Sequence, residues 1–329
     1  MEEITDSGNP PKPAYAANLK NPFLLAAAVG DNSPFRYIGG TLIIFGAFFM
    51  GQIPLTLVLM VFGMMNEIPL EQLSDTNALL AAGFDKTALL FLYILSFMIG
   101  VLAIWLVIRF MHRRNFLTLI TPLKKLNWKK LFTAFFIYFL LSGCFEIALY
   151  MQDTDNYVFQ FEPVRFFILT AVVLVFLPFQ TSFEELVFRG YLLQGFSFMF
   201  RSSVPALILT SILFALLHSW NPEVKQHGFW VMFPYYCGFG LLLGFITLKD
   251  KGMEIALAVH AANNIFSSLF VTFESSALQT DALFMQKEMN PAKMMPLYFL
   301  SMFLFLLICS FVFGWWKKKT IENIPENEI

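Results

Sequence analysis

The sequence predicts an all-α fold, a polytopic membrane bundle of about eight transmembrane helices. Hydrophobic residues make up 57% of the 329-residue chain and charged residues only 14%, which excludes an ordinary soluble domain. Long apolar runs recur along the chain, each close to the ~20 residues that cross the ~30 Å hydrocarbon core of a bilayer. Lysine and arginine are concentrated in a few of the connections between these runs, as in a helical membrane protein.

The apolar runs divide the chain into two tails and two groups of helices. The runs are residues 37–64, 88–110, 131–151, 166–190, 203–219, 229–248, 252–273 and 296–316. They predict three transmembrane helices over 37–151 and a core of five over 152–316, with tails over 1–36 and 317–329. The first 36 residues contain no apolar segment long enough for a signal peptide, so this tail is expected to be cytoplasmic.

Positive charge predicts the side of the membrane on which each end lies. The connection after the second run carries Arg109, Arg113, Arg114, Lys124, Lys125, Lys129 and Lys130, and the C-terminal tail begins with Lys317, Lys318 and Lys319. Both segments are cytoplasmic by the positive-inside rule, and an even number of spans places both termini there. The formal net charge of -1 is distributed over separate loops and indicates no nucleic-acid partner.

The stretch Ser182–Gly190, SFEELVFRG, places three charged side chains in an apolar region. A charge at the centre of a spanning helix costs about 2.5–3.5 kcal/mol on insertion scales, so these side chains need partners, water or a function. Glu185 and Arg189 are four residues apart and can pair on one helix face. Glu184 lies about 100° round the helix from Glu185, so we expect it to face another group.

Two of the four histidines lie within spans, and each has a companion one helical turn away. His218 follows Phe214 in the sequence FALLH, and His260 precedes Asn264 in HAANN. Residues four apart share a helix face, so each pair is expected to point in one direction.

The polar residues around Arg201 predict a reversal of the chain between the fourth and fifth runs. Glu184 and His218 are equally far from Arg201 in the sequence, so two antiparallel helices joined there bring both side chains to one depth. The seventh run, with His260 near its middle, can supply a third side of the same pocket.

A carboxylate, two imidazoles and a carboxamide at one depth can activate a water molecule. Glu184 can take a proton from the water. His218 and His260 can hold a divalent metal such as zinc, which lowers the pKa of bound water and polarises a carbonyl group. Asn264 can complete the coordination or donate a hydrogen bond to a developing oxyanion.

Each of these groups also has a purely structural interpretation. A single histidine in a span is more often a hydrogen-bonded packing residue than a ligand, and a Glu185–Arg189 pair can simply hold its helix in register. Glu146, in the third run, is expected to reach the outer interface or to bond to a neighbouring helix. The conjunction of both span histidines with the Glu-Glu-Arg turn, all in one half of the chain, favours a site.

These residues resemble the signatures of the CPBP family of intramembrane proteases, the CAAX prenyl protease and bacteriocin-processing (ABI) family, which includes the type II CAAX prenyl endopeptidases. The family motifs EExxxR, FxxxH and HxxxN or HxxxB match EELVFR at Glu184–Arg189, FALLH at Phe214–His218 and HAANN at His260–Asn264, in that order. The resemblance covers about residues 166–273. It implies a bundle of about eight helices around a cavity that holds a peptide near its cleavage site.

The resemblance also implies a role for each matched residue. It implies that Glu184 is the base that activates water. It implies that His218, His260 and Asn264 hold a metal or a water molecule, and that Glu185 and Arg189 form an essential supporting pair. Family members have been interpreted both as zinc metalloproteases and as glutamate-dependent proteases with an optional metal. We expect a divalent metal, zinc, held by His218, His260, Glu184 and Asn264.

The expected function is that of an intramembrane metalloendopeptidase in a bacterial inner (cell) membrane, with a peptide or membrane-protein substrate and the lipid bilayer as its partners. Two other functions fit the same residues. An ion- or proton-coupled transporter also uses intramembrane acids and histidines, and a non-catalytic immunity or scaffold protein can retain the fold. The sequence leaves open the oligomeric state, and whether the substrate is a pheromone, a bacteriocin, a membrane protein or a prenylated tail.

Two arrangements are possible for the side of the membrane from which a substrate reaches the site. The charge pattern places His218 near the outer end of the fifth run, whereas family members that act on CAAX tails work from the cytoplasmic side. Either the hairpin around Arg201 projects beyond the membrane, or the protein cuts from outside. We expect the first arrangement, because Gln194–Arg201 is polar enough to lie in the interface.

Overall fold

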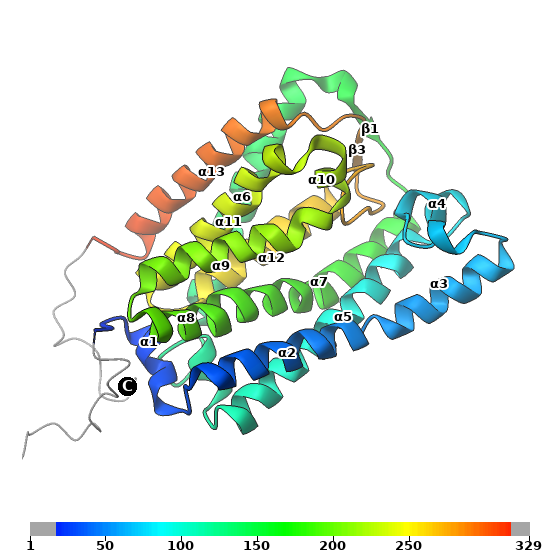
Figure 1. Cartoon of the computed structure of the whole chain (residues 1–329). Helices are drawn as coiled ribbons and strands as arrows, with labels where there is room; N and C mark the ends of the chain where they lie inside the picture. The colour runs from blue at the N-terminus through cyan, green and yellow to red at the C-terminus, as the bar shows by residue number, and fades with distance from the viewer. Residues whose placement is uncertain (1–17, 317–329) are drawn as a thin grey trace, which may run out of the picture.

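The computed structural model describes residues 18–316, which form a bundle of long helices with a small sheet at one end (Figure 1). The predicted all-α polytopic bundle is confirmed. Residues 1–17, about half of the predicted N-terminal tail, and residues 317–329, the whole of the predicted C-terminal tail, lie outside the described residues.

The long helices account for most of the chain. They are α2 (Pro34–Met50), α3 (Ile53–Met65), α5 (Lys86–Leu106), α6 (Trp128–Gln152), α7 (Pro163–Glu185), α9 (Ser203–Leu217), α11 (Phe229–Asp250), α12 (Glu254–Leu269) and α13 (Pro291–Val312). The shorter helices are α1 (Pro22–Leu25), α4 (Thr76–Ala81), α8 (Leu193–Phe200) and α10 (Pro222–His227). Two π-helical segments, Val107–Met111 and Leu186–Leu192, continue α5 and α7. Short 3₁₀ turns lie at Ala26–Val29, Leu70–Gln72, Phe116–Leu119, Thr154–Asn156 and His218–Trp220.

Seven helical segments of the described chain are long and apolar enough to cross a bilayer. They are Pro34–Met65, Lys86–Met111, Trp128–Gln152, Pro163–Phe200, Ser203–Trp220, Phe229–Asp250 and Pro291–Val312. They coincide with seven of the eight predicted runs. The remaining run forms α12, whose 16 residues rise only about 24 Å, less than the ~30 Å hydrocarbon core. A short helix does not need to meet lipid at both ends when it lies inside a bundle, and α12 packs against α6, α7 and α11.

The helix α7 lies near the centre of the bundle, with α5 on one side and α12 on the other (Figure 1). Leu169, Val173 and Leu177, spaced four residues apart along α7, are fully buried and form a core cluster with residues of α5 and α12. This packing fixes the position and rotation of the helix that ends at Glu184 and Glu185. The chain reverses direction at Arg201, which adopts a left-handed backbone conformation (φ 53°). The helices α8 and α9 therefore run side by side, as predicted.

A three-stranded sheet covers the end of the bundle where α10 lies (Figure 1). Its strands β1 (Tyr157–Phe159), β2 (Val271–Phe273) and β3 (Phe284–Gln286) have the order β1-β3-β2, with β3 antiparallel to β1 and parallel to β2. The sheet was not predicted, because strands of three residues leave almost no periodic pattern. The sheet also explains the position of Glu146. Its Oε1 accepts a hydrogen bond of 2.8 Å from the hydroxyl of Tyr157, the first residue of β1, and not from a residue of the site.

The described part of the predicted N-terminal tail is packed into the opposite end of the bundle. Phe23 and Leu24 have no exposed surface. The Asn21 side chain donates to the carbonyl oxygen of Leu248 at 2.7 Å, and Gln194 donates to the carbonyl oxygen of Phe23 at 3.2 Å. Residues 18–33 therefore tie the ends of α8 and α11 together rather than forming a free tail.

Replacing Phe23 with Ala is expected to lower the free energy of unfolding by about 3–5 kcal/mol, because the change removes a fully buried aromatic ring and leaves a cavity. Thermal unfolding of the purified protein in detergent measures the loss. Val29→Ala, in the same segment at a side chain that is 72% exposed, is the matched control. Equal melting temperatures for the two variants would contradict this packing role.

Candidate active site

The charged motif lies where α7 changes from α-helix to π-helix. Glu184 and Glu185 are the last residues of α7, and Arg189 and Gly190 lie in the π-helical segment that follows. Single-turn π segments are rare and occur frequently at functional sites. Gly190 is required by close packing, since a Cβ there would lie 2.8 Å from Leu119 Cγ and 3.2 Å from the Leu119 carbonyl oxygen.

The Glu185 carboxylate is fully buried and is neutralised by a buried guanidinium. Arg189 Nη1 donates to Glu185 Oε1 at 2.9 Å, as the four-residue spacing predicted. The Arg189 guanidinium carbon also lies 4.3 Å from the centroid of the Phe214 ring, an arrangement in which the ring face attracts the cation. The FxxxH phenylalanine therefore covers the ion pair.

His260 on α12 is held by the same carboxylate. Its Nδ1 lies 2.6 Å from Glu185 Oε1. Because a carboxylate only accepts hydrogen bonds, chemistry assigns the proton to Nδ1 and leaves a lone pair on Nε2 in the neutral ring. That Nε2 lies 3.6 Å from Glu184 Oε2.

His218, at the end of α9, presents the same atom to the same oxygen. Its Nδ1 lies 2.8 Å from the Phe214 carbonyl oxygen, which also only accepts, so the Nδ1–H tautomer is assigned here too. Its Nε2 lies 3.8 Å from Glu184 Oε2. The ring is stacked on Tyr236 with centroids 4.5 Å apart, which restricts its rotation.

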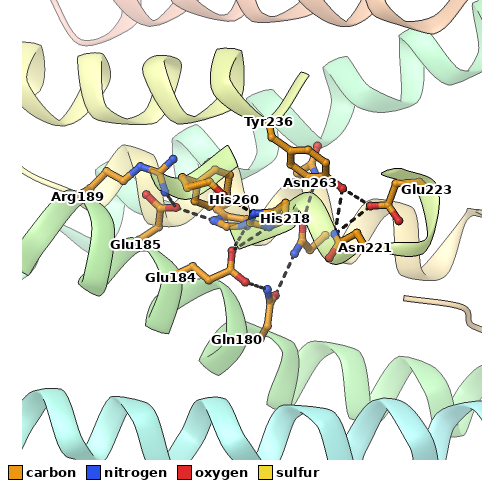
Figure 2. A network of polar contacts seen from close by, with 12 residues as sticks. Gln180, Glu184, Glu185, Arg189, His218, Asn221, Glu223, Tyr236, His260 and Asn263 are labelled. Carbon is orange, nitrogen blue, oxygen red and sulfur yellow. Dashed lines mark hydrogen bonds and ion pairs between the residues drawn. The ribbon is translucent and has the colours of Figure 1, made fainter. Parts of the chain in front are cut away.

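Three hydrogen-bond acceptors therefore face one another at the centre of the site (Figure 2). Glu184 Oε1 accepts a hydrogen bond from Gln180, whereas Oε2 is buried and has no hydrogen-bond partner among the described residues. A carboxylate oxygen opposed by two imidazole lone pairs is unfavourable unless a proton, a water molecule or a cation lies between them. The arrangement is suited to holding such a group.

The structure brings five of the six predicted site residues into one cluster, and it connects the sixth, Asn264, to that cluster through Gln180. Glu184, Glu185, Arg189, His218 and His260 are joined by the contacts described above. Asn264, on α12, hydrogen-bonds to neighbouring amides and not to the imidazoles. Its Nδ2 donates to Gln180 Oε1 at 3.0 Å, and its Oδ1 accepts from Asn263 at 3.1 Å.

The donor chemistry at the centre fits a divalent cation, although the distances are slightly wide. Within residues 18–316 no group of three or more His, Cys, Asp or Glu side chains is spaced as a complete metal-binding set. Ligand atoms around a tetrahedral zinc with bonds of ~2.1 Å are about 3.4 Å apart. The distances from Glu184 Oε2 to the Nε2 atoms of His260 and His218, 3.6 and 3.8 Å, exceed this value by a few tenths of an ångström. Oε2 is shared by both distances and has no hydrogen-bond partner among the described residues. The His260–Glu185 contact is also the support that metal-bound histidines usually have.

Two sets of contacting residues were missed by sequence reasoning. Gln180 carried a usable signal, because it is a polar residue in an apolar helix and lies one turn before Glu184. The second set lies beyond His218: the Tyr236 hydroxyl donates to buried Glu223, and Asn221 contacts both of them. These side chains come from the connection after α9 and from α11, and no sequence spacing links them to the motif.

Comparison with known proteins gives a match over the helices that carry the site. A family model described as Type II CAAX prenyl endopeptidase Rce1-like matches residues 163–266, a range that contains all six predicted residues. A relative named "Uncharacterized protein YyaK", from Bacillus subtilis (strain 168), is 33% identical over 248 residues, which cover 75% of this chain and 81% of that protein. No solved structure matches.

Removing one partner of the buried Glu185–Arg189 pair is expected to destabilise the protein by about 3–5 kcal/mol, because the other charge is left uncompensated. We expect Glu185→Met and Arg189→Met each to show this cost. The double variant is expected to cost clearly less than the two together, since no unpaired charge remains. Unfolding in detergent micelles measures the free energies.

The exposed pair Lys293–Asp153 is the control, because breaking it is expected to change stability by less than about 1 kcal/mol. Additive costs for Glu185 and Arg189 would show that the two side chains do not stabilise each other.

Proposed function

The chain belongs to the Rce1-like family of type II CAAX prenyl endopeptidases, and we propose that it hydrolyses a peptide bond within or beside the membrane by attack of a water molecule that Glu184 activates. The observation that carries the proposal is the convergence of Glu184 Oε2 with the Nε2 atoms of His218 and His260, at 3.8 and 3.6 Å. A water molecule at that point has acceptors for both of its protons.

The proposed reaction begins with water donating one hydrogen to Glu184 Oε2 and the other to an imidazole Nε2. The water oxygen then attacks the carbonyl carbon of the scissile peptide bond as Glu184 takes its proton. When the carbon–nitrogen bond breaks, the protonated Glu184 gives this proton to the leaving amine. The remaining oxygen and hydrogen of the water stay with the new carboxyl group, so the atoms balance.

The other site residues have supporting roles in this proposal. Asn264 uses one amide hydrogen on Gln180 and keeps a second that can donate to the developing oxyanion. Glu185 holds the Nδ1–H of His260 and so keeps the lone pair on Nε2. Arg189 balances the charge of Glu185, which lets a second carboxylate lie beside it in a medium of low dielectric constant.

A divalent metal, zinc in our proposal, would be held by the Nε2 atoms of His218 and His260 with Glu184. When bound, it would supply a lower pKa for the attacking water and would polarise the substrate carbonyl. The fit of the donor atoms supports this part of the proposal. Asn264 would join the coordination through Oδ1, the oxygen that accepts from Asn263 and still has a second lone pair.

The protein is an integral membrane protein with several spans, and we further propose that both of its termini are cytoplasmic. The positive charges between Arg109 and Lys130 support this orientation. The lipid bilayer and a peptide or membrane-protein substrate are then its partners.

His218 lies at the end of α9 that leads to α10, the end opposite to α1 (Figure 1).

Glu184→Gln is expected to abolish proteolysis, with a loss of about 100-fold or more, because the amide cannot take the proton from water. Mass spectrometry compares the peptides of membranes from cells that produce the wild type or the variant. Glu162→Gln, at the exposed start of the same helix, is the matched control. Identical peptide profiles for wild type and Glu184→Gln would remove the proposal.

About one zinc ion per chain is expected in the purified wild type, and the His218→Ala/His260→Ala double variant is expected to lose it. Inductively coupled plasma mass spectrometry gives the metal content independently of activity. The Glu162→Gln protein, purified in parallel, should retain the metal. Metal-free protein with full activity would remove zinc from the proposal and leave the role of Glu184 intact.

A further inference from the structure

Gln180 is a buried polar residue that touches the site and has no role in the reaction as proposed above. It lies on α7, one turn before Glu184, and only 7% of its surface is exposed. Its Nε2 donates to Glu184 Oε1 (Figure 2). Its Oε1 accepts a hydrogen bond of 3.0 Å from Asn264 Nδ2. One amide thus joins the proposed base on α7 to the carboxamide on α12.

The charge of Glu184 fixes the orientation of three amides in series. An ionised carboxylate only accepts, so the NH₂ group of Gln180 must face Glu184 and its oxygen must face Asn264. Asn264 must then present its own NH₂ group to Gln180. Its oxygen is left to accept from Asn263 Nδ2, at 3.1 Å. Each amide orientation follows from the one before it.

The hydrogen bond to Glu184 also selects the oxygen that is available for chemistry. Because Oε1 is held by Gln180, Oε2 is the oxygen that faces the Nε2 atoms of His218 and His260. Without this bond the carboxylate can rotate about its terminal torsion, which is broad. Glu184 would then present either oxygen, at variable distances from the two rings.

We propose that Gln180 is a positioning residue that holds Glu184 with Oε2 toward the imidazoles and turns the amide of Asn264 toward the reacting carbonyl. This inference rests on the proposed function, because it assigns to Gln180 the placement of the proposed base. It acts through Glu184 and Asn264 and does not touch the substrate.

The alternative is that Gln180 is only a buried amide whose hydrogen bonds stabilise the fold. Gln194 provides a matched comparison on the continuation of the same helix. It is fully buried, accepts from Arg114 Nη2 at 2.8 Å, and donates to the carbonyl oxygens of Phe23 and Thr118. None of these contacts belongs to the site, so Gln194→Met reports the stability cost of losing a buried amide, including its bond to buried Arg114, without disturbing the site.

The test compares Gln180→Met, Gln180→Glu and Gln194→Met in the full-length protein reconstituted in lipid vesicles. The probe is an internally quenched synthetic copy of a peptide segment whose cleavage is lost in Glu184→Gln membranes. For Gln180→Met we expect a kcat about 10- to 100-fold lower with KM within about twofold, as for a displaced catalytic group. Gln180→Glu keeps an acceptor for Asn264 but replaces the amide donor with a carboxyl group that must share a proton with Glu184, so it is also expected to lose kcat.

Gln194→Met is expected to lower the melting temperature while kcat per folded protein stays within about twofold. The inference is overturned if Gln180→Met or Gln180→Glu keeps the wild-type kcat, or if Gln194→Met loses kcat to the same extent. Where Gln180→Met does not fold, the near-isosteric Gln180→Glu decides the question alone. If the cleavage of no peptide is lost in Glu184→Gln membranes, the proposed function itself fails. If Glu184→Gln is inactive while Gln180→Met is fully active, only the positioning role of Gln180 is refuted.

Discussion

The structure of the site depends on the cost of placing a carboxylate where there is almost no water. Glu185 is completely buried, and it is compatible with the fold because Arg189 and His260 both contact the same oxygen, Oε1, at 2.9 and 2.6 Å. These contacts link two segments that are far apart in the sequence. They also determine the tautomer of His260, and so the lone pair that faces Glu184. One buried ion pair therefore sets the geometry of the proposed reacting groups.

The surrounding bundle brings the groups together by ordinary helix packing. The apolar stripe of Leu169, Val173 and Leu177 fixes α7 against its neighbours, and Gly190 allows close approach to Leu119. Phe214 contributes from α9 in two ways, since its ring covers Arg189 and its carbonyl oxygen binds His218 Nδ1. The polar cluster is small, and the apolar packing around it determines the relative positions of its members.

Much of the fold and most of the site could be predicted from the sequence. Apolar runs predict spans because lipid tolerates little else, and the i,i+4 spacing of Glu185 and Arg189 predicts their contact. The reversal at Arg201 correctly placed His218 beside Glu184. The convergence of His260 on the same carboxylates required the packing of α12 against α7. The place of His260 near the middle of the seventh run suggested a third side of the pocket, but no spacing fixed that contact.

Other features left no usable pattern in the sequence. The π-helical segment after Glu185 depends on tertiary packing, and α12 is shorter than its apolar run because the last residues of that run form β2. Residues 18–33 hold one short apolar patch, Phe23–Val29, which is too short to predict docking from a pattern, yet Phe23 and Leu24 are fully buried. The position of Asn264 behind Gln180 depends on a hydrogen bond between two helices, which the match to a motif does not reveal.

The account depends most on the two imidazoles facing Glu184 with Nε2 atoms that carry no hydrogen. Nitrogen-15 NMR of protein labelled in histidine measures this directly, because the chain has only four histidines and single replacements assign them. Protonated and unprotonated ring nitrogens have well-separated chemical shifts. We predict that His218 and His260 at neutral pH both carry hydrogen on Nδ1 and none on Nε2. A proton on Nε2 of either ring, in the neutral or the charged form, would contradict the arrangement.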